Sequence, residues 1–155
     1  MKALSLTQPW ASLVVLGMKR WETRRWRTSY RGYLLIHASK RLPAECQALC
    51  REEPFKSALG GHVLPTGAII GQVKLTGCFG TASVDRTVRE YFGGLRIPPD
   101  DRERAFGDYS PGRWAFRLEN PVWFSEPLPY SGSLGIFEVL DDGLLTKALL
   151  RAGKP

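Results

Sequence analysis

The stretch LGMKRWETRRWR, residues 16–27, concentrates side chains that could bind or transform an anion. It places five cations around the single carboxylate of Glu22 and adds two tryptophan rings: Lys19, Arg20, Arg24, Arg25, Arg27, Trp21 and Trp26. Guanidinium groups pair with phosphates, and nucleic-acid bases stack on aromatic rings. The stretch therefore predicts one wall of an anion-binding pocket, and single-stranded RNA is the ligand class that suits it.

The same stretch also has a purely structural interpretation. A strand over 20–26 would place Arg20, Glu22, Arg24 and Trp26 on one face and Trp21, Thr23 and Arg25 on the other. Neither face is apolar, so the alternative is a salt-bridged edge strand in which Glu22 pairs with Arg20 or Arg24. The tryptophan rings would then pack under arginine stems. That alternative accounts for Glu22 but leaves most of the arginines without partners.

Lys19 is the residue in this stretch that could take part in catalysis. Neighbouring arginines would lower the pKa of its amine, and Glu22 would raise it. A lysine whose pKa is lowered can serve as a base or a nucleophile. The alternative is that Lys19 stays charged and binds a phosphate. The sequence favours the phosphate role and leaves both open.

Charge is distributed unevenly along the 155 residues, which carry a net charge of +7. Residues 1–60 hold 11 basic and 4 acidic side chains, whereas residues 61–155 hold 11 of each. A localised surplus of this kind indicates a polyanionic partner. The hydrophobic content of 43% is that of a globular chain, and we expect a single domain over residues 1–155.

The sequence predicts a cytoplasmic protein that does not contact a membrane. It contains no apolar run long enough to span a bilayer, and the N-terminal MKALSLTQPW lacks the features of a signal peptide. The cysteines, Cys46, Cys50 and Cys78, are odd in number, which argues against a disulfide framework. Without a C-x-x-C pair they are better interpreted as small buried residues than as metal ligands.

Hydrophobic patterns and turn residues predict a mostly β chain with short helices inserted. We expect strands over 2–6, 20–26, 32–39, 67–79, 113–118 and 135–140, and helices over 9–16, 43–53, 83–94 and about 142–152. Residues 95–112 are expected to form a surface loop, and Asn120–Pro121 a turn. Gly71 is expected to mark a bulge in its strand. Without regular βαβ alternation, this order favours an α+β fold built on a mixed barrel with flanking helices.

The chain resembles the ASCH domain, a family named for homology to the activating signal cointegrator 1. The family signature G-x-K-x-x-E-x-R falls on Gly17, Lys19, Glu22 and Arg24, within LSLTQPWASLVVLGMKRWETR and before GYLLIHASK. GAIIGQVKLTGC, FGDYSPGRWAFRLENP and EPLPYSGSLGIFEV resemble later parts of the family in the same order. The likeness covers most of residues 2–140.

This resemblance implies a PUA-like β-barrel, related to domains that bind structured or modified RNA, with a cleft lined by the signature residues. Some members resemble amidohydrolases that remove the acetyl group of acetylcytidine with the signature lysine, a threonine and a glutamate. Others have been proposed as ribonucleases, for which a divalent metal would be the cofactor. This sequence has the lysine, Lys19, and carries Glu22 where those amidohydrolases carry threonine.

Other residues extend the predicted site. The resemblance suggests that Ser39 and Lys40 line the same cleft, and Tyr130 and Ser131 lie on a turn that could close over a ligand. Tyr109 and Arg113 could face the cleft or stabilise a turn, and His37 is expected in the core. The predicted nucleic-acid contacts are therefore Lys19, Arg20, Glu22, Arg24, Arg25, Trp26, Ser39, Lys40, Tyr109, Arg113, Tyr130 and Ser131. No phosphate-cradling or dinucleotide motif is present, so no organic cofactor is expected.

Three functional hypotheses remain open. The first is an RNA-binding domain in which Lys19, Arg24 and Arg25 contact phosphates, Trp26 or Trp21 stacks on a base, and affinity falls steeply with salt. The second is a small hydrolase of RNA or a modified nucleoside, with Lys19 and Glu22 as its catalytic pair. The third is a basic surface for an acidic protein partner.

Overall fold

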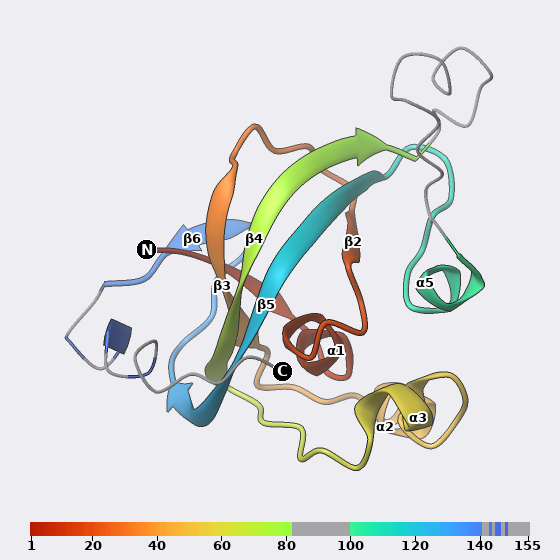
Figure 1. Cartoon of the computed structure of the whole chain (residues 1–155), viewed down its shortest axis with the longest axis horizontal. Coiled ribbons are helices and arrows are strands. Elements are labelled where there is room, and N and C mark those ends of the chain that lie inside the picture. The colour runs from red at the N-terminus through yellow and green to blue at the C-terminus, as the bar shows by residue number, and fades with distance from the viewer. Residues whose placement is uncertain (82–99, 141–142, 144, 147, 149–155) are drawn as a thin grey trace.

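Six strands form one mixed sheet that curves into a half-barrel, as the computed structural model of the chain shows (Figure 1). The structure describes residues 1–81, 100–140, 143, 145, 146 and 148. The strand order is β2-β5-β4-β3-β1-β6, with β1 and β3 parallel. The strands are β1 (Lys2–Leu6), β2 (Trp21–Arg24), β3 (Gly32–Ala38), β4 (Ala68–Gly80), β5 (Trp114–Pro129) and β6 (Ile136–Glu138). The helices described are α1 (Trp10–Val15), α2 (Ala44–Leu49), α3 (Phe55–Leu59) and α5 (Asp101–Ala105).

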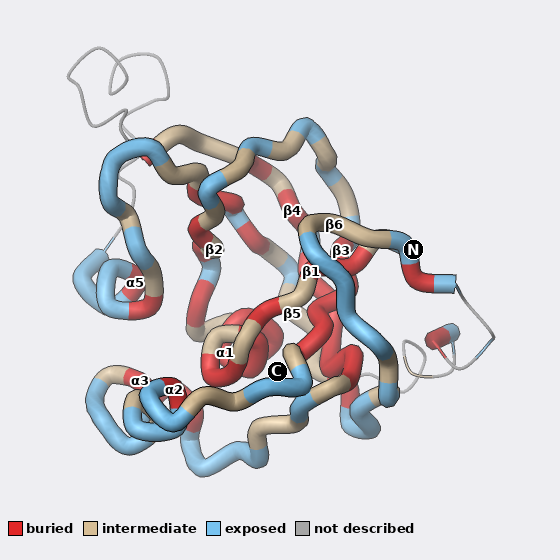
Figure 2. The backbone as a smooth tube through the Cα atoms, turned by 180° about the vertical axis from the view of Figure 1, so that it is seen from behind, coloured by how far each residue is buried: buried red, intermediate tan, exposed pale blue. Residues whose placement is uncertain are grey.

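The unbroken apolar run of β3 follows from its position inside the sheet. Leu34 and Ile36 face a core that also takes in α1, whereas Leu35 faces a second core with Ile69 and Phe124. Because both faces of the strand are covered, apolar residues are required at successive positions. Burial is accordingly concentrated in the sheet and α1, and the connecting segments are largely exposed (Figure 2).

Helix α1 packs directly on the sheet where Gly71 lies in β4. A Cβ atom at Gly71 would clash with the carbonyl oxygen of Val122 and the side chain of Val15. The ladders on both sides of β4 shift register next to Gly71. The predicted bulge is therefore confirmed, and the glycine allows the close approach of helix and sheet.

The predicted helix over 43–53 is wrong in extent, because two short helices occupy this region. Helix α2 ends at Leu49, and α3 follows Pro54. Phe55 of α3 packs against Phe106, with ring centroids 5.0 Å apart, and both join Leu13 of α1 in a third apolar cluster. The spacing of Phe55, Ala58 and Leu59 places these side chains on one helix face.

The predicted turn at Asn120–Pro121 is also wrong, since β5 continues through it to Pro129. Asn120 adopts a positive φ of 50°, and the pairing with β4 skips residues there. Asn tolerates this conformation, and Pro121 needs no ladder hydrogen bond at a bulge. The pair bends a long strand instead of reversing the chain.

Two further predictions concern the chain after β4. Part of the predicted loop over 95–112 is helix α5, capped by Asp100, whose side chain accepts a hydrogen bond from the Glu103 N–H at 2.8 Å. The predicted helix over 83–94 lies outside the described residues. Of the predicted C-terminal helix, Leu145, Thr146 and Ala148 are described and are helical.

Within the described residues, no helix is long and apolar enough to cross a membrane. In that same part of the chain, no three His, Cys, Asp or Glu side chains are grouped so that they could hold a metal ion. All three cysteines are free, and the Cys50 thiol donates to the carbonyl of Cys46 at 3.2 Å.

Candidate nucleotide-binding site

The edge strand β2 places alternate residues of the basic stretch on opposite faces. Trp21 and Thr23 are buried, whereas Glu22 and Arg24 are partly exposed. Trp21 packs against Phe79, with ring centroids 5.7 Å apart, and is only 4% exposed. The alternation is confirmed over Trp21–Arg24, but the strand ends there, and the predicted place of Arg25 on the face of Trp21 is wrong because Arg25 is exposed at the cleft. Trp21 as a stacking surface for bases is also wrong, because its ring belongs to the interior.

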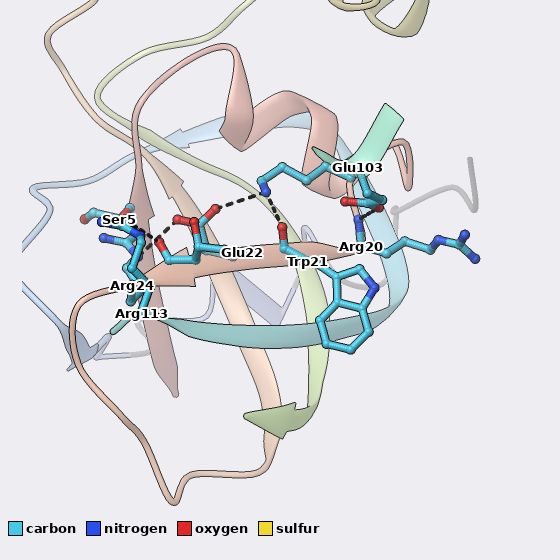
Figure 3. Close-up of polar contacts among 9 residues, drawn as sticks. Ser5, Arg20, Trp21, Glu22, Arg24, Glu103 and Arg113 are labelled. Carbon is cyan, nitrogen blue, oxygen red and sulfur yellow. Dashed lines mark hydrogen bonds and ion pairs between the residues drawn. The ribbon is translucent and has the colours of Figure 1, made fainter. Parts of the chain in front are cut away.

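Lys19, immediately before β2, is a buried charged residue with 1% of its surface exposed. Its Nζ donates to the carbonyl oxygen of Trp21 and lies 3.6 Å from Glu22 Oε2 (Figure 3). An amine enclosed in this way cannot reach a phosphate in solvent. The predicted direct phosphate contact by Lys19 is therefore wrong.

Glu22 bridges the buried lysine to the surface of the molecule. Its other oxygen, Oε1, lies 3.1 Å from Nε of Arg24. Arg24 Nη2 donates in turn to the carbonyl oxygen of Ser5 in β1 at 2.7 Å (Figure 3). The Glu22–Arg24 ion pair of the alternative interpretation is thus present, whereas the tryptophan rings, which it placed under arginine stems, pack against Phe79 and Phe116. Glu22 engages Lys19 and Arg24, while no ion pair holds Arg25 within the described part of the chain.

Burial lowers the pKa of Lys19 because desolvation disfavours its charged form. The carboxylates of Glu22 and Glu103 oppose this effect, but desolvation is the largest contribution. The amine is therefore easier to deprotonate than an ordinary lysine amine.

Glu103 on α5 is a site residue that the sequence prediction missed. It is 1% exposed, and its Oε1 accepts the backbone N–H of Arg20 at 2.5 Å. Its Oε2 has no hydrogen-bond partner among the described residues, and burial raises the pKa of the carboxyl group. Asp100 followed three residues later by Glu103 is a helix-start pattern that could have placed this carboxylate on a helix.

A cleft of about 680 Å³ opens beside β2, and we call it the arginine cleft. It is lined by Ser5, Leu6, Thr7, Trp10, Glu22, Thr23, Arg24, Arg25, Trp26, Leu49, Phe55, Ala105, Phe106, Gly107, Asp108 and Arg113. Trp26 is partly exposed and packs edge-on against Phe116. Lys19 Nζ lies behind the cleft wall, since a Cβ atom on Gly107 would be 3.4 Å from it.

The charges in the arginine cleft are mixed. Arg24, Arg25 and Arg113 line it together with Glu22 and Asp108. Arg113 pairs with Asp108 at 3.2 Å, as Arg24 does with Glu22. The donors and acceptors of this cleft are held in fixed positions. Such a cleft suits a single polar ligand that offers complementary hydrogen-bonding groups better than it suits an extended polyanion.

Arg20 and Tyr109 do not line the arginine cleft. The Arg20 side chain is exposed and points away from Glu22 and Arg24 (Figure 3). The Tyr109 hydroxyl is buried and finds no hydrogen-bond partner in the part of the chain that the structure describes, and burial raises its pKa. The structure therefore gives neither predicted contact a place on the cleft surface, whereas Arg113 has one.

Four other predicted contacts lie in a second cleft. Ser39, Lys40, Tyr130 and Ser131 line a hollow of about 1150 Å³, which we call the Lys40 cleft. The prediction that they share the cleft of the signature residues is wrong, although Ser5 lines both hollows. His37 is buried as predicted and forms part of the wall.

The family model of the ASCH domain matches residues 4–121, which include part of β1, the strands β2 to β4, part of β5 and the arginine cleft. The chain belongs to the ASCH domain family. The ASCH signature residues Gly17, Lys19, Glu22 and Arg24 thus include the buried lysine and its carboxylate bridge. ASCH domains are PUA-like and are generally associated with RNA.

Curated relatives of this ASCH domain are the activating signal cointegrator 1 proteins of Homo sapiens and Mus musculus. Each is 41% identical over 80 residues, which is 48% of this chain and 14% of the relative. The chain therefore matches a small part of each of these longer proteins.

Among solved structures, a point-mutant form of an ASCH protein from Zymomonas mobilis matches with a TM-score of 0.51 and 14% identity. The match covers 96% of this chain and 94% of that chain. The unmutated ASCH structure from the same organism covers 96% and 92%, with 15% identity and a TM-score of 0.49. The match with the TM-score of 0.51, together with the half-barrel and short helices of this chain, confirms the expected α+β, PUA-like fold.

Proposed function

We propose that this ASCH domain binds single-stranded RNA and that the arginine cleft holds one nucleotide of it. The observation that carries the proposal is the mixed lining of the cleft, with three arginines, two carboxylates and the edge of Trp26 around about 680 Å³. Single-stranded RNA is recognised by stacking its splayed bases and by hydrogen bonds to their edges. The cleft offers groups for both interactions.

Each group has a role in the proposed complex. Arg25 is exposed at the cleft and contacts the phosphate, because no ion pair engages it within the described residues. Trp26 stacks on the base. The Glu22 carboxylate can accept hydrogen bonds in addition to its interactions with its two internal partners. It accepts a hydrogen bond from an exocyclic amino group, such as that of cytosine. Arg24 and Arg113, already paired, hold Glu22 and Asp108 in place.

This arrangement changes the expected salt dependence of binding. Two of the three cleft arginines are neutralised internally, so few counterions are released when RNA binds. We expect a shallow slope corresponding to about one or two phosphates, roughly 0.7 per phosphate for a single strand. The steep dependence expected from the sequence is replaced by this weaker one.

The test measures binding of a labelled single-stranded RNA hexamer by fluorescence anisotropy at several salt concentrations. Arg25→Ala should weaken binding about tenfold and reduce the salt slope by about 0.7. Lys56→Ala, which removes an exposed charge on α3 outside both clefts, is the matched control and should change affinity less than about twofold.

An equal loss of RNA affinity in Arg25→Ala and Lys56→Ala would show that net charge alone governs binding. Displacement of the RNA by an acidic peptide at similar concentration would instead favour the protein-partner hypothesis. No binding of any RNA would refute the proposal.

A second candidate function, hydrolysis of an acetylated nucleoside, is favoured by the buried amine of Lys19. Its lowered pKa makes a neutral amine accessible, and Glu22 and Glu103 lie within electrostatic reach. In this hydrolysis Glu22, which lines the arginine cleft and lies 3.6 Å from the buried amine, takes a proton from water, and the water oxygen attacks the acetyl carbonyl carbon. The bond from that carbon to N4 breaks, the nitrogen receives the proton, and acetate and cytidine leave.

Incubation with acetylcytidine tests this second candidate, with cytidine and acetate measured by chromatography. The hydrolase predicts product that Glu22→Gln abolishes and that Lys19→Met reduces, because the buried amine acts through Glu22. If the wild type forms no more product than Glu22→Gln does, hydrolysis is refuted and RNA binding alone remains.

A further inference from the structure

The Lys40 cleft offers a different chemistry from the arginine cleft. Its walls carry the hydroxyl groups of Ser39, Thr66, Tyr130, Ser131 and Ser133 and the ammonium of Lys40, while the Ser5 hydroxyl is engaged by His37. None of the described residues that line it is acidic. Hydroxyl donors around one cation, without a carboxylate, suit a phosphate group better than a base edge.

The cleft is built where three strands come together at one end of the sheet. Ser39 follows β3, Gly67 precedes β4, and Tyr130 follows β5. Backbone hydrogen bonds join these ends: the Gly67 N–H donates to Ala38 at 2.8 Å, and the Tyr130 N–H donates to Gly67 at 3.1 Å. The sheet therefore fixes the spacing between the hydroxyl groups and Lys40.

His37 secures the segment 131–133, which carries two of the hydroxyl groups. The imidazole is 3% exposed, with Nδ1 at 3.0 Å from Ser5 Oγ and Nε2 at 2.9 Å from the Tyr130 carbonyl oxygen. Gly132 lies so close that a Cβ atom would clash with the imidazole and with Ser5 Oγ. The segment is thus packed onto β1 and β3.

Ser5 stands between the two clefts. Its carbonyl oxygen accepts the hydrogen bond of Arg24 in the arginine cleft, and its side chain lines the Lys40 cleft. A ligand of two or more linked nucleotides can pass over Ser5 and occupy both the arginine cleft and the Lys40 cleft. A single nucleotide occupies one of them.

We propose that the Lys40 cleft binds the phosphate of a nucleotide neighbouring the one in the arginine cleft, so that this domain recognises an RNA strand and not a free nucleotide. The inference rests on the proposed function of the arginine cleft. It assigns Lys40 and the surrounding hydroxyl groups to a second subsite, which is occupied only when a second nucleotide is linked to the first.

The experiment compares cytidine monophosphate with an RNA hexamer as ligands, by calorimetry for the former and anisotropy for the latter. Lys40→Ala should weaken hexamer binding about tenfold and leave binding of the mononucleotide within about twofold. Arg25→Ala should weaken both ligands. Lys56→Ala should weaken neither.

The outcomes separate the two proposals. If Lys40→Ala leaves hexamer affinity unchanged while Arg25→Ala reduces it, the second subsite is refuted and the proposed function stands. Equal weakening of both ligands by Lys40→Ala also refutes the subsite. Binding of inorganic phosphate that Lys40→Ala abolishes, without any dependence on RNA length, indicates a free-anion site and refutes it as well. Arg25→Ala without effect on either ligand refutes the proposed function.

Discussion

At the scale of single residues, the enclosed amine of Lys19 dominates the chemistry of the site. Its 1% exposure removes hydration that a charged ammonium needs, and the Trp21 carbonyl and Glu22 supply partial replacement. Desolvation is the largest contribution and lowers the pKa, so the folded protein favours the neutral amine more than the unfolded chain does.

The lowered pKa of Lys19 predicts that this residue makes the free energy of unfolding depend on pH. Between its lowered pKa and the ordinary value of 10.5, the unfolded chain binds the proton and the folded chain does not. The free energy of unfolding of the wild type should therefore rise with pH, relative to Lys19→Met, by up to about 1.4 kcal/mol per pH unit. Urea unfolding of both proteins from pH 7 to 10 measures the difference.

The control for this prediction is Lys74→Met on β4, where the lysine is exposed. Its difference from the wild type should stay nearly constant over the same pH range. A wild-type advantage that falls with rising pH in the Lys19→Met comparison would show that Glu22 and Glu103 outweigh desolvation.

At the scale of elements, α5 positions a carboxylate that closes the back of the site. The helix has five residues, and Glu103 lies at the position where the Asp100 side chain caps it. So short a helix depends on its cap and its tertiary contacts more than on intrinsic propensity. The bond from Arg20 N–H to Glu103 Oε1 links α5 to the start of β2.

Removing the Asp100 cap should destabilise α5 and its hydrogen bond to the Arg20 N–H. Asp100→Ala is expected to lower the free energy of unfolding by about 1 kcal/mol, because the Glu103 N–H loses its acceptor. Asp101→Ala, in the next position and exposed, is the matched control and should have an effect below about 0.5 kcal/mol. Chemical denaturation of the two variants compares them directly, and equal losses would contradict the capping role.

At the scale of the whole molecule, the half-barrel carries two clefts, and Ser5 lines both of them. The connection runs through residues distant in sequence: Ser5 of β1, His37 of β3 and Tyr130 after β5. Burial lowers the pKa of His37, so the neutral imidazole is the form that the fold accommodates. The wall of the Lys40 cleft, which His37 lines, therefore depends on the protonation state of one side chain.

A pH effect on folding follows from that dependence. Since the pKa of His37 is lowered, its contribution to stability is present above the ordinary value of 6.5 and is lost as pH falls below it. His37→Gln should be less stable than the wild type at pH 8 by about 1 kcal/mol, and the difference should shrink at pH 5. Thermal unfolding at both pH values measures this, and a difference that widens at pH 5 would contradict it.

Much of the sheet could be predicted from local patterns, because burial imposes them directly. The run Leu34 to Ala38 had to be an interior strand, and the alternation in Trp21 to Arg24 had to separate two faces. Short helices were harder to predict from the sequence. Helices α3 and α5 each have only five residues, and they gain stability because Phe55 and Phe106 pack on α1. Asn120–Pro121 carries a turn pattern, but the long ladder with β4 overrides it.

The sequence by itself determined which residues carry the charge, where the family signature lies and that strands predominate, because composition and periodicity are local properties. Only the tertiary structure decided that Lys19 is buried, that Glu103 approaches it, and that Lys40 belongs to a separate cleft. These outcomes depend on how distant strand ends meet, and burial and electrostatic pairing are set by neighbours in space.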